Sequence, residues 1–195
     1  MDINLSRIRG IGPARLQALK ADGIETVRQL LLRLPAEYRD LTSVTPIDQL
    51  AEGQTAAVSG WIETPRSFRK GRLAIVSAKV SDESGSIRAV WYNQPWLAKT
   101  LSGGREVLLY GRVEKRGSLQ LSSPSLEKER GIIPVYRKTA GIPGAAFRDI
   151  VVQALRESEG QWPDQLPEEL RRRHGLCERN FAMRAAHLPE SMEAL

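Results

Sequence analysis

The sequence has 195 residues, 41% of them hydrophobic and 27% charged, which is typical of a folded globular chain and excludes wholesale disorder. No apolar run approaches the roughly 20 residues that a membrane span needs, and the N-terminus has no apolar signal region, so we expect a cytoplasmic protein without a membrane partner. The single cysteine, Cys177, excludes an internal disulfide bond. The net charge of +6 favours a polyanionic partner.

The positive charge is concentrated in the middle of the chain. The segment Gly53–Arg116 holds 11 basic and 5 acidic residues, which equals the excess of the whole chain. Residues 131–195 hold nine of each sign. A basic segment inside a folded domain indicates a surface suited to phosphates.

Residues 1–45 are predicted to form short helices joined by tight turns. Apolar residues recur there at three- and four-residue spacings, and Pro13 fits the first turn of a helix. Thr26 is a candidate N-cap, Leu34-Pro35 ends the helical pattern, and residues 37–40 are predicted to form a loop.

The turn from Ile8 to Gly12 has the hydrophobic-x-Gly-hydrophobic-Gly pattern of helix-hairpin-helix motifs. The amides of Gly10 and Gly12, which no side chain screens, are therefore candidate contacts to a DNA phosphate. The alternative is a purely structural turn between two packed helices.

Residues 46–130 are predicted to form a β-barrel. Gly, Ser-Asp and Lys-Arg-Gly turns separate five segments rich in Val, Ile and aromatic residues. A helical pattern over Asn93–Leu101 falls between the third and fourth of them, and this order favours a Greek-key OB-fold over an SH3-like barrel. The five predicted strands are Thr55–Glu63, Leu73–Val80, Ser86–Tyr92, Glu106–Glu114 and Ser118–Leu126.

The predicted loop between the first two strands, residues 64–72, carries four cations and one aromatic residue but no carboxylate. This loop is one of those with which OB-folds clamp nucleic acid. We predict that its cations neutralise phosphates and that Phe68 covers a base. A solvated hairpin tip is the alternative. The four cations are Arg66, Arg69, Lys70 and Arg72.

Trp91, Tyr92 and Trp96 place three large aromatic residues within six positions, flanked by Arg88 and Lys99. Because side chains alternate along a strand, only one of Trp91 and Tyr92 faces the barrel core. Tyr92 and Trp96 are therefore candidates for stacking on bases, with the two cations beside them. The alternative is an aromatic cluster that closes one end of the barrel.

Residues 131–195 are predicted to form a partly helical linker that packs on another part of the chain. The segment Ile132–Tyr136 reads as a short extended piece, and the apolar spacing over residues 147–155 predicts an amphipathic helix. Three prolines then break the chain into short helical pieces.

The sequence contains no motif for catalysis or for holding a cofactor. It lacks a phosphate-binding loop of the G-x-x-x-x-G-K-[ST] type, so we expect no ATP hydrolysis by this chain alone. His174 and Cys177 have the spacing of half a zinc site, but a second pair of ligands is missing, so we expect no metal site. We predict no catalytic residue, metal or cofactor.

Several short motifs in this order make the chain resemble the N-terminal wedge region of the RecG helicases, ATP-dependent enzymes that remodel branched DNA. The resemblance runs from about Ile8 to about Pro189, nearly the full chain. The motifs are Gly10-Ile-Gly-Pro13, Ile24-Glu-Thr-Val-Arg-Gln-Leu-Leu31, Leu34-Pro-Ala-Glu-Tyr-Arg-Asp40, Val80-Ser-Asp-Glu-Ser-Gly85, Trp91-Tyr-Asn-Gln-Pro-Trp-Leu97, Pro134-Val-Tyr136 and Thr139-Ala-Gly141.

The resemblance implies an OB-fold that sits at the branch point of DNA while a separate C-terminal motor pulls the duplex. In that family two aromatic residues after the third barrel strand stack on bases, and they correspond to Tyr92 and Trp96. Phenylalanine followed by tyrosine is the commoner pair, so this chain keeps both rings and differs in their identity. The motor motifs are outside these 195 residues, which suits either a fragment or a stand-alone relative.

We therefore expect a mainly β protein with helical appendages, divided into residues 1–45, 46–130 and 131–195. Its expected function is to bind and split DNA forks and Holliday junctions as a monomeric, non-catalytic module of the bacterial nucleoid, with a helicase motor in cis in a longer protein. One alternative is a free-standing OB-fold that binds single-stranded DNA or RNA. Another is a scaffold whose aromatic residues bind a protein.

Overall fold

The computed structural model describes residues 3–194, and the chain divides into two compact units. One unit contains Asp40–Gly131, and the other combines Met1–Arg39 with Ile132–Leu195. The division into three segments at positions 45 and 130 stays a prediction. The first and last of the three predicted segments pack together in a single unit.

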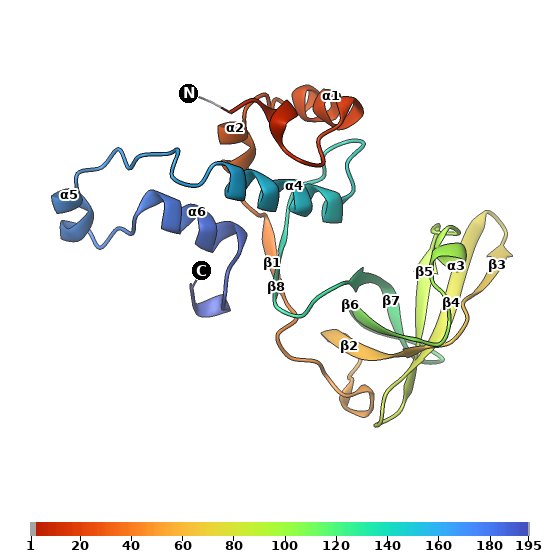
Figure 1. Ribbon diagram of the computed structural model, residues 1–195. Coiled ribbons are helices and arrows are strands. Elements are labelled where there is room, and N and C mark those ends of the chain that lie inside the picture. Colours follow the sequence, from red (N-terminus) through yellow and green to blue (C-terminus); the bar gives the residue numbers. More distant parts are fainter. Residues whose placement is uncertain (1–2, 195) are drawn as a thin grey trace. The chain divides into compact units, whose positions relative to one another are not determined.

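The unit Asp40–Gly131 is a closed β-barrel with one additional strand (Figure 1). The sheet order is β2-β6-β7-β5-β4-β3, and a further pairing of β2 with β4 closes the ring. β5 and β7 pair in parallel, whereas the other neighbours are antiparallel. The strands are β2 (Thr55–Ile62), β3 (Arg66–Lys70), β4 (Leu73–Ser81), β5 (Ser86–Tyr92), β6 (Arg105–Arg116) and β7 (Ser118–Glu127).

The barrel core is built by alternation along the strands. Every second residue of β4 and β5 is buried inside, because successive side chains of a strand point to opposite faces. Trp91 is the largest of these side chains, is 1% exposed, and donates a hydrogen bond of 2.7 Å from Nε1 to the carbonyl oxygen of Pro124. The core residues of these two strands are Val76, Ala78, Val80, Ile87, Ala89 and Trp91.

The predicted OB-fold barrel is confirmed, and two details of it are corrected. The segment Arg66–Lys70, predicted as part of a loop, is strand β3, which pairs with β4 over its whole length. All five of its side chains are exposed, so its sequence lacks the apolar alternation by which a strand is predicted. The helix after β5 is α3 (Leu97–Thr100), shorter than the predicted span.

The other unit is mostly helical, with one two-stranded sheet. β1, predicted as a loop, pairs with β8, and both strands owe their structure to this main-chain pairing between distant parts of the chain. The elements are the 3-10 helix η1 (Leu5–Arg7), α1 (Pro13–Ala21), α2 (Val27–Leu31), β1 (Glu37–Asp40), β8 (Ile132–Val135), α4 (Gly144–Glu157), α5 (Glu168–Arg173), α6 (Arg179–His187) and η3 (Met192–Ala194); the short η2 (Ile47–Gln49) belongs to the barrel unit.

The predicted linker packs on the N-terminal helices and shares a core with them. Helix α4 buries Phe147, Ile150 and Val151 in the same cluster as Leu19 and Leu30 of the N-terminal helices. The helices α1 and α2 are nine and five residues long. Helices this short are marginal in isolation, so packing against α4 supplies the burial that they need.

His187, the last residue of α6, makes two hydrogen bonds that hold the end of this helix in the core. It is 1% exposed, its Nε2 lies 2.8 Å from the carbonyl oxygen of Leu31, and its Nδ1 lies 2.8 Å from the hydroxyl of Tyr136. Because a carbonyl oxygen only accepts, Nε2 carries the proton and donates, and Nδ1 accepts from the tyrosine. Burial lowers the pKa of His187, against the opposing effect of the hydrogen bond to Leu31, so the imidazole is neutral.

This burial predicts that the helical unit loses stability as the pH falls from about 7 to about 5. An unfolded histidine takes up a proton near pH 6.5, whereas folded His187 does so only at a lower pH, so protonation favours unfolding. One such proton costs at most about 1.4 kcal/mol per pH unit. Urea unfolding at a series of pH values measures the slope.

His187→Gln removes the titrating group and is expected to abolish that slope, whereas His174→Gln, at an exposed position, keeps it. Hydrogen bonds lower the pKa values of Asp40 and Asp164. The stability that these two carboxylates contribute is therefore lost only at a pH below the range in which His187 takes up its proton. A slope that survives in His187→Gln contradicts the prediction.

Candidate nucleic-acid interface

Phe68 and Tyr92 share the outer face of the barrel. In the strand register Phe68 of β3 lies opposite Ile75 of β4, and Ile75 lies opposite Tyr92 of β5. Cross-strand partners project to the same side of a sheet, and two strand spacings separate the outer pair by about 10 Å. Phe68 is 51% exposed and Tyr92 is half-buried. The structure thus brings the two predicted rings into one row.

Three of the predicted cations lie on that same outer face. Arg66 and Lys70 stand two positions on either side of Phe68, and Arg88 stands four positions before Tyr92. All three side chains are exposed. Arg69 and Arg72 are also exposed, but Arg69 alternates to the opposite side of β3 and Arg72 follows in the turn after Gly71.

Trp96 is held at the edge of the barrel by a strained turn and a short helix. Asn93 has a φ of 56°, in the left-handed region that asparagine tolerates, and its amide donates a hydrogen bond of 2.7 Å to the carbonyl oxygen of Ala74. Trp96 then caps α3 and is 56% exposed, while Leu101 after the helix is buried in the core. Lys99, in α3, is exposed.

The three aromatic residues of this segment therefore have different environments. Trp91 is buried in the core, Tyr92 is half-buried on the outer face, and Trp96 is largely exposed. The alternative of an aromatic cluster that closes the barrel applies to Trp91 alone. The assignment of Trp91 to the inside and Tyr92 to the outside follows the predicted alternation.

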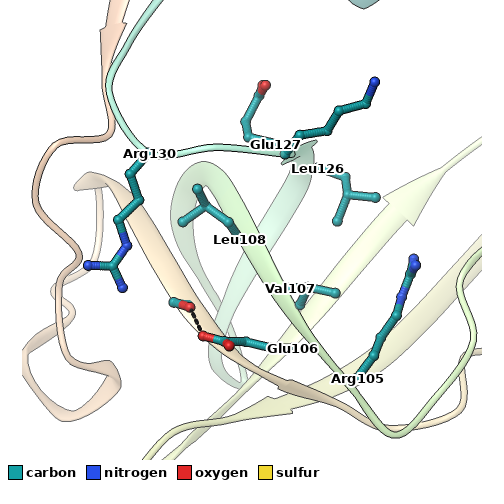
Figure 2. A pocket seen from close by; sticks show the side chains of 9 residues that line it. Arg105, Glu106, Val107, Leu108, Leu126, Glu127 and Arg130 are labelled. Carbon is teal, nitrogen blue, oxygen red and sulfur yellow. Dashed lines mark hydrogen bonds between the residues drawn. The ribbon is translucent and has the colours of Figure 1, made fainter.

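A separate hollow of ≈ 520 Å³ lies along β6 and the end of β7 (Figure 2). Arg105, Glu106, Glu127 and Arg130 contribute charges of both signs, and Ser59 donates a hydrogen bond of 2.7 Å to Glu106. None of the predicted site residues lines it. Lys128 also lines the hollow, so two carboxylates stand beside three cations there, whereas residues 64–72 carry four cations and no carboxylate. The predicted interface and the hollow are different surfaces.

Comparison with known proteins places this architecture in a family. The RecG wedge domain family matches residues 4–157. The chain belongs to that family. It is 31% identical to the ATP-dependent DNA helicase RecG of Escherichia coli K12 over 96% of the chain, and 26% identical to that of Thermotoga maritima over 98% of the chain. It spans 28% and 26% of the length of these two relatives.

The structural comparison agrees with the family assignment. A solved structure described as RecG bound to a three-way DNA junction matches all of this chain with a TM-score of 0.82 and 25% sequence identity. The chain covers 28% of that protein. The fold of this RecG wedge domain, including its helical unit, is therefore also present in the RecG protein that was solved with a three-way DNA junction.

The β6–β7 hairpin of this RecG wedge domain also contributes to the surroundings of Tyr92, which the sequence pattern does not predict. The guanidinium carbon of Arg116 lies over the Tyr92 ring, 5.6 Å from its centroid, and Gln120 Nε2 donates a hydrogen bond of 3.3 Å to the Tyr92 hydroxyl. The basic pair Lys115 and Arg116 precedes Gly117, and this pattern by itself predicts only a turn.

The predicted glycine turn of this RecG wedge domain belongs to the helical unit. Gly10 has a φ of +95°, which glycine adopts without strain, and Gly12 is the extended N-cap of α1 without a side-chain cap. Arg15 Nη1 donates a hydrogen bond of 2.7 Å to the Gly10 carbonyl oxygen. The turn has the predicted geometry, and its contact with a phosphate stays a prediction.

Residues 3–194 of this RecG wedge domain contain no group of three or more His, Cys, Asp or Glu side chains arranged to hold a metal ion. Over the same residues, no helix is both long enough and apolar enough to cross a membrane. Cys177 is a free, exposed thiol.

Proposed function

We propose that this chain is the branched-DNA-binding wedge of a RecG-type helicase, which recognises forks and Holliday junctions and separates their strands. The observation that carries the proposal is the pair of outward rings, Tyr92 and Trp96, on a barrel whose adjoining hairpin carries exposed cations. The relative solved with a three-way DNA junction supports it.

The proposed mechanism divides the work between rings and cations. A branch point exposes the face of a terminal base pair, and an aromatic ring covers that face without unstacking intact duplex, a step that costs a few kcal/mol. Arg66, Lys70 and Arg88 neutralise phosphates of the diverging strands on the outer face, while Phe68 is placed to cover an unpaired base. The amides of Gly10 and Gly12 and the cations Arg69, Arg72 and Lys99 are further proposed phosphate contacts.

We propose that the chain acts without catalysis of its own, as a monomer on bacterial DNA in the nucleoid. Its relatives are ATP-dependent DNA helicases, and the ATP-driven motor is the proposed partner in cis. ATP turnover by the purified chain would contradict the proposal that the chain has no catalytic activity of its own.

The affinity for different DNA shapes tests the proposed function. We expect the chain to bind a three-way fork about tenfold or more tightly than duplex or single strands of equal length, because stacking on one exposed base is worth roughly 1–3 kcal/mol. Fluorescence anisotropy at one fixed salt concentration measures the three affinities.

The same titrations separate the alternatives. A preference for single strands over the fork would favour the free-standing OB-fold that binds single-stranded DNA or RNA. Binding to no DNA at any salt concentration would favour a protein scaffold.

The cations of the β3–β4 hairpin are expected to act through counterion release. With four to six phosphate contacts the logarithm of affinity falls against the logarithm of salt with a slope of roughly −3 to −5. Replacing Arg66 and Lys70 with glutamine is expected to flatten this slope by about 1 to 2 units.

The matched control is Arg105→Gln with Lys128→Gln, which removes the same charge beside the hollow in Figure 2. This control is expected to leave the slope unchanged. Equal flattening of the salt slope by both pairs of substitutions would show that the slope depends on the net charge of the chain and not on the cations of the hairpin.

A further inference from the structure

The Tyr92 ring is contacted by two side chains of the β6–β7 hairpin. The guanidinium carbon of Arg116 lies over the ring at 5.6 Å from its centroid, within the range of a cation–π interaction. Gln120 Nε2 donates a hydrogen bond of 3.3 Å to the hydroxyl. One group thus covers a face of the ring, and the other fixes its polar end.

Both contacting side chains are themselves held in place. Arg116 Nε donates a hydrogen bond of 3.3 Å to Glu114 Oε2, two positions earlier on the same strand, and this contact orients the guanidinium. Gln120 is 7% exposed and lies opposite Glu114 on β6 and Arg88 on β5. A buried glutamine between two strands has few rotamers, so the direction of its bond to Tyr92 is fixed.

Arg116 is poorly explained by the stability of the barrel. Its side chain is 61% exposed and that of Glu114 is 33% exposed, and an ion pair at the surface adds little to the stability of the fold. Lys115, the preceding residue, carries the same charge and projects to the other side of the strand. The position over the ring distinguishes Arg116 from its neighbour.

We propose that Arg116 and Gln120 are positioning residues that hold the Tyr92 ring with one face covered and the opposite face presented to the exposed base pair of a DNA branch point. This inference rests on the proposed function of the chain. A ring that is held before DNA arrives loses less conformational freedom on stacking, so the pair raises the affinity for a fork without touching a base. The hydroxyl that Gln120 holds is the atom by which tyrosine differs from phenylalanine.

A double-mutant cycle between Arg116→Met and Tyr92→Ala tests the proposal, with fork and duplex affinities measured for each variant. Methionine keeps the apolar stem of the side chain and removes its charge. Arg116→Met is expected to weaken fork binding about two- to fivefold more than duplex binding, the range of a cation–π contact at an exposed site. In the Tyr92→Ala background this extra loss is expected to disappear.

The fluorescence of a modified base gives a readout that does not respond to a change in the net charge of the protein. With 2-aminopurine at the last base pair before the branch point and saturating protein, stacking of Tyr92 quenches the base. Arg116→Met and Tyr92→Phe are expected to reduce this quenching, because each removes one contact and keeps the ring. Lys115→Met, the matched control, is expected to lower fork and duplex affinities equally and to leave the quenching unchanged.

The outcomes separate this inference from the proposed function. In one outcome Arg116→Met has the same effects as Lys115→Met, while Tyr92→Ala still weakens fork binding. This outcome would overturn the positioning role and leave the proposed function of the chain unaffected. Tyr92→Ala without effect on fork binding would overturn the stacking role, and the positioning role with it. Coupling of Arg116 to Tyr92 on the fork, with reduced quenching, supports the inference.

Discussion

Replacing Tyr92 and Trp96 together with alanine is expected to weaken binding to a DNA fork by about 2–4 kcal/mol, since each lost base stack contributes roughly 1–3 kcal/mol. Duplex affinity is expected to change little, because an intact duplex offers no exposed base for the rings to cover. Both residues project out of the barrel core, so the double variant keeps its fold. Fork and duplex titrations at one salt concentration, together with thermal melting, measure these three quantities.

Trp61→Ala is the matched control for this experiment. Trp61 is 61% exposed on β2, where it lies opposite Ser81 and Glu106, away from the row that contains Tyr92. Its loss removes a ring of the same kind from the same barrel and is expected to leave fork selectivity unchanged. Equal losses on fork and duplex in the double variant, or a lowered melting temperature, would contradict the stacking role.

Replacing Trp91 with alanine is expected to give the opposite result. The protein loses much of its stability, and binding to fork and to duplex is weakened equally. Trp91 is 1% exposed, and the truncation of a buried aromatic residue to alanine costs about 3–5 kcal/mol. Urea unfolding of the barrel unit measures this loss. The apparent affinities of the whole sample for fork and duplex are expected to fall by the same factor, because only the folded fraction binds DNA.

Trp91→Phe separates packing from hydrogen bonding at this position. Phenylalanine keeps an aromatic ring but leaves the Pro124 carbonyl oxygen without the donor that Trp91 Nε1 supplies at 2.7 Å. An unsatisfied buried acceptor costs about 1–3 kcal/mol, so this variant is expected to fall between the native chain and Trp91→Ala. Native stability of Trp91→Ala would show that Trp91 does not support the core.

The barrel could be predicted from the sequence because burial on one face leaves a period of two. The same alternation separates Trp91 from Tyr92, two adjacent aromatic residues with opposite orientations. β3 leaves no such pattern, since all five of its side chains are exposed and only main-chain pairing with β4 makes it a strand.

Contacts between distant parts of the chain explain what the sequence could not predict. β1 pairs with β8, and the amide of Ala36 donates to the carbonyl oxygen of Val135 at 2.8 Å, a pairing that no local pattern contains. Arg116 and Tyr92 are likewise brought together by strand order alone. Local spacing therefore predicts which residues face outward, whereas the register decides which of them meet.

Strand β3 has a consequence for the protein before it meets any partner. Among residues 3–194 it pairs with β4 alone, so its other edge presents main-chain amides and carbonyls that another copy of the chain can extend into a larger sheet. Arg66, Arg69 and Lys70 occupy three of its five positions, and their mutual repulsion across such a junction opposes that growth. The cations proposed to attract DNA thus also protect the hairpin from self-association. Replacing them with apolar residues would therefore increase the tendency of the protein to aggregate.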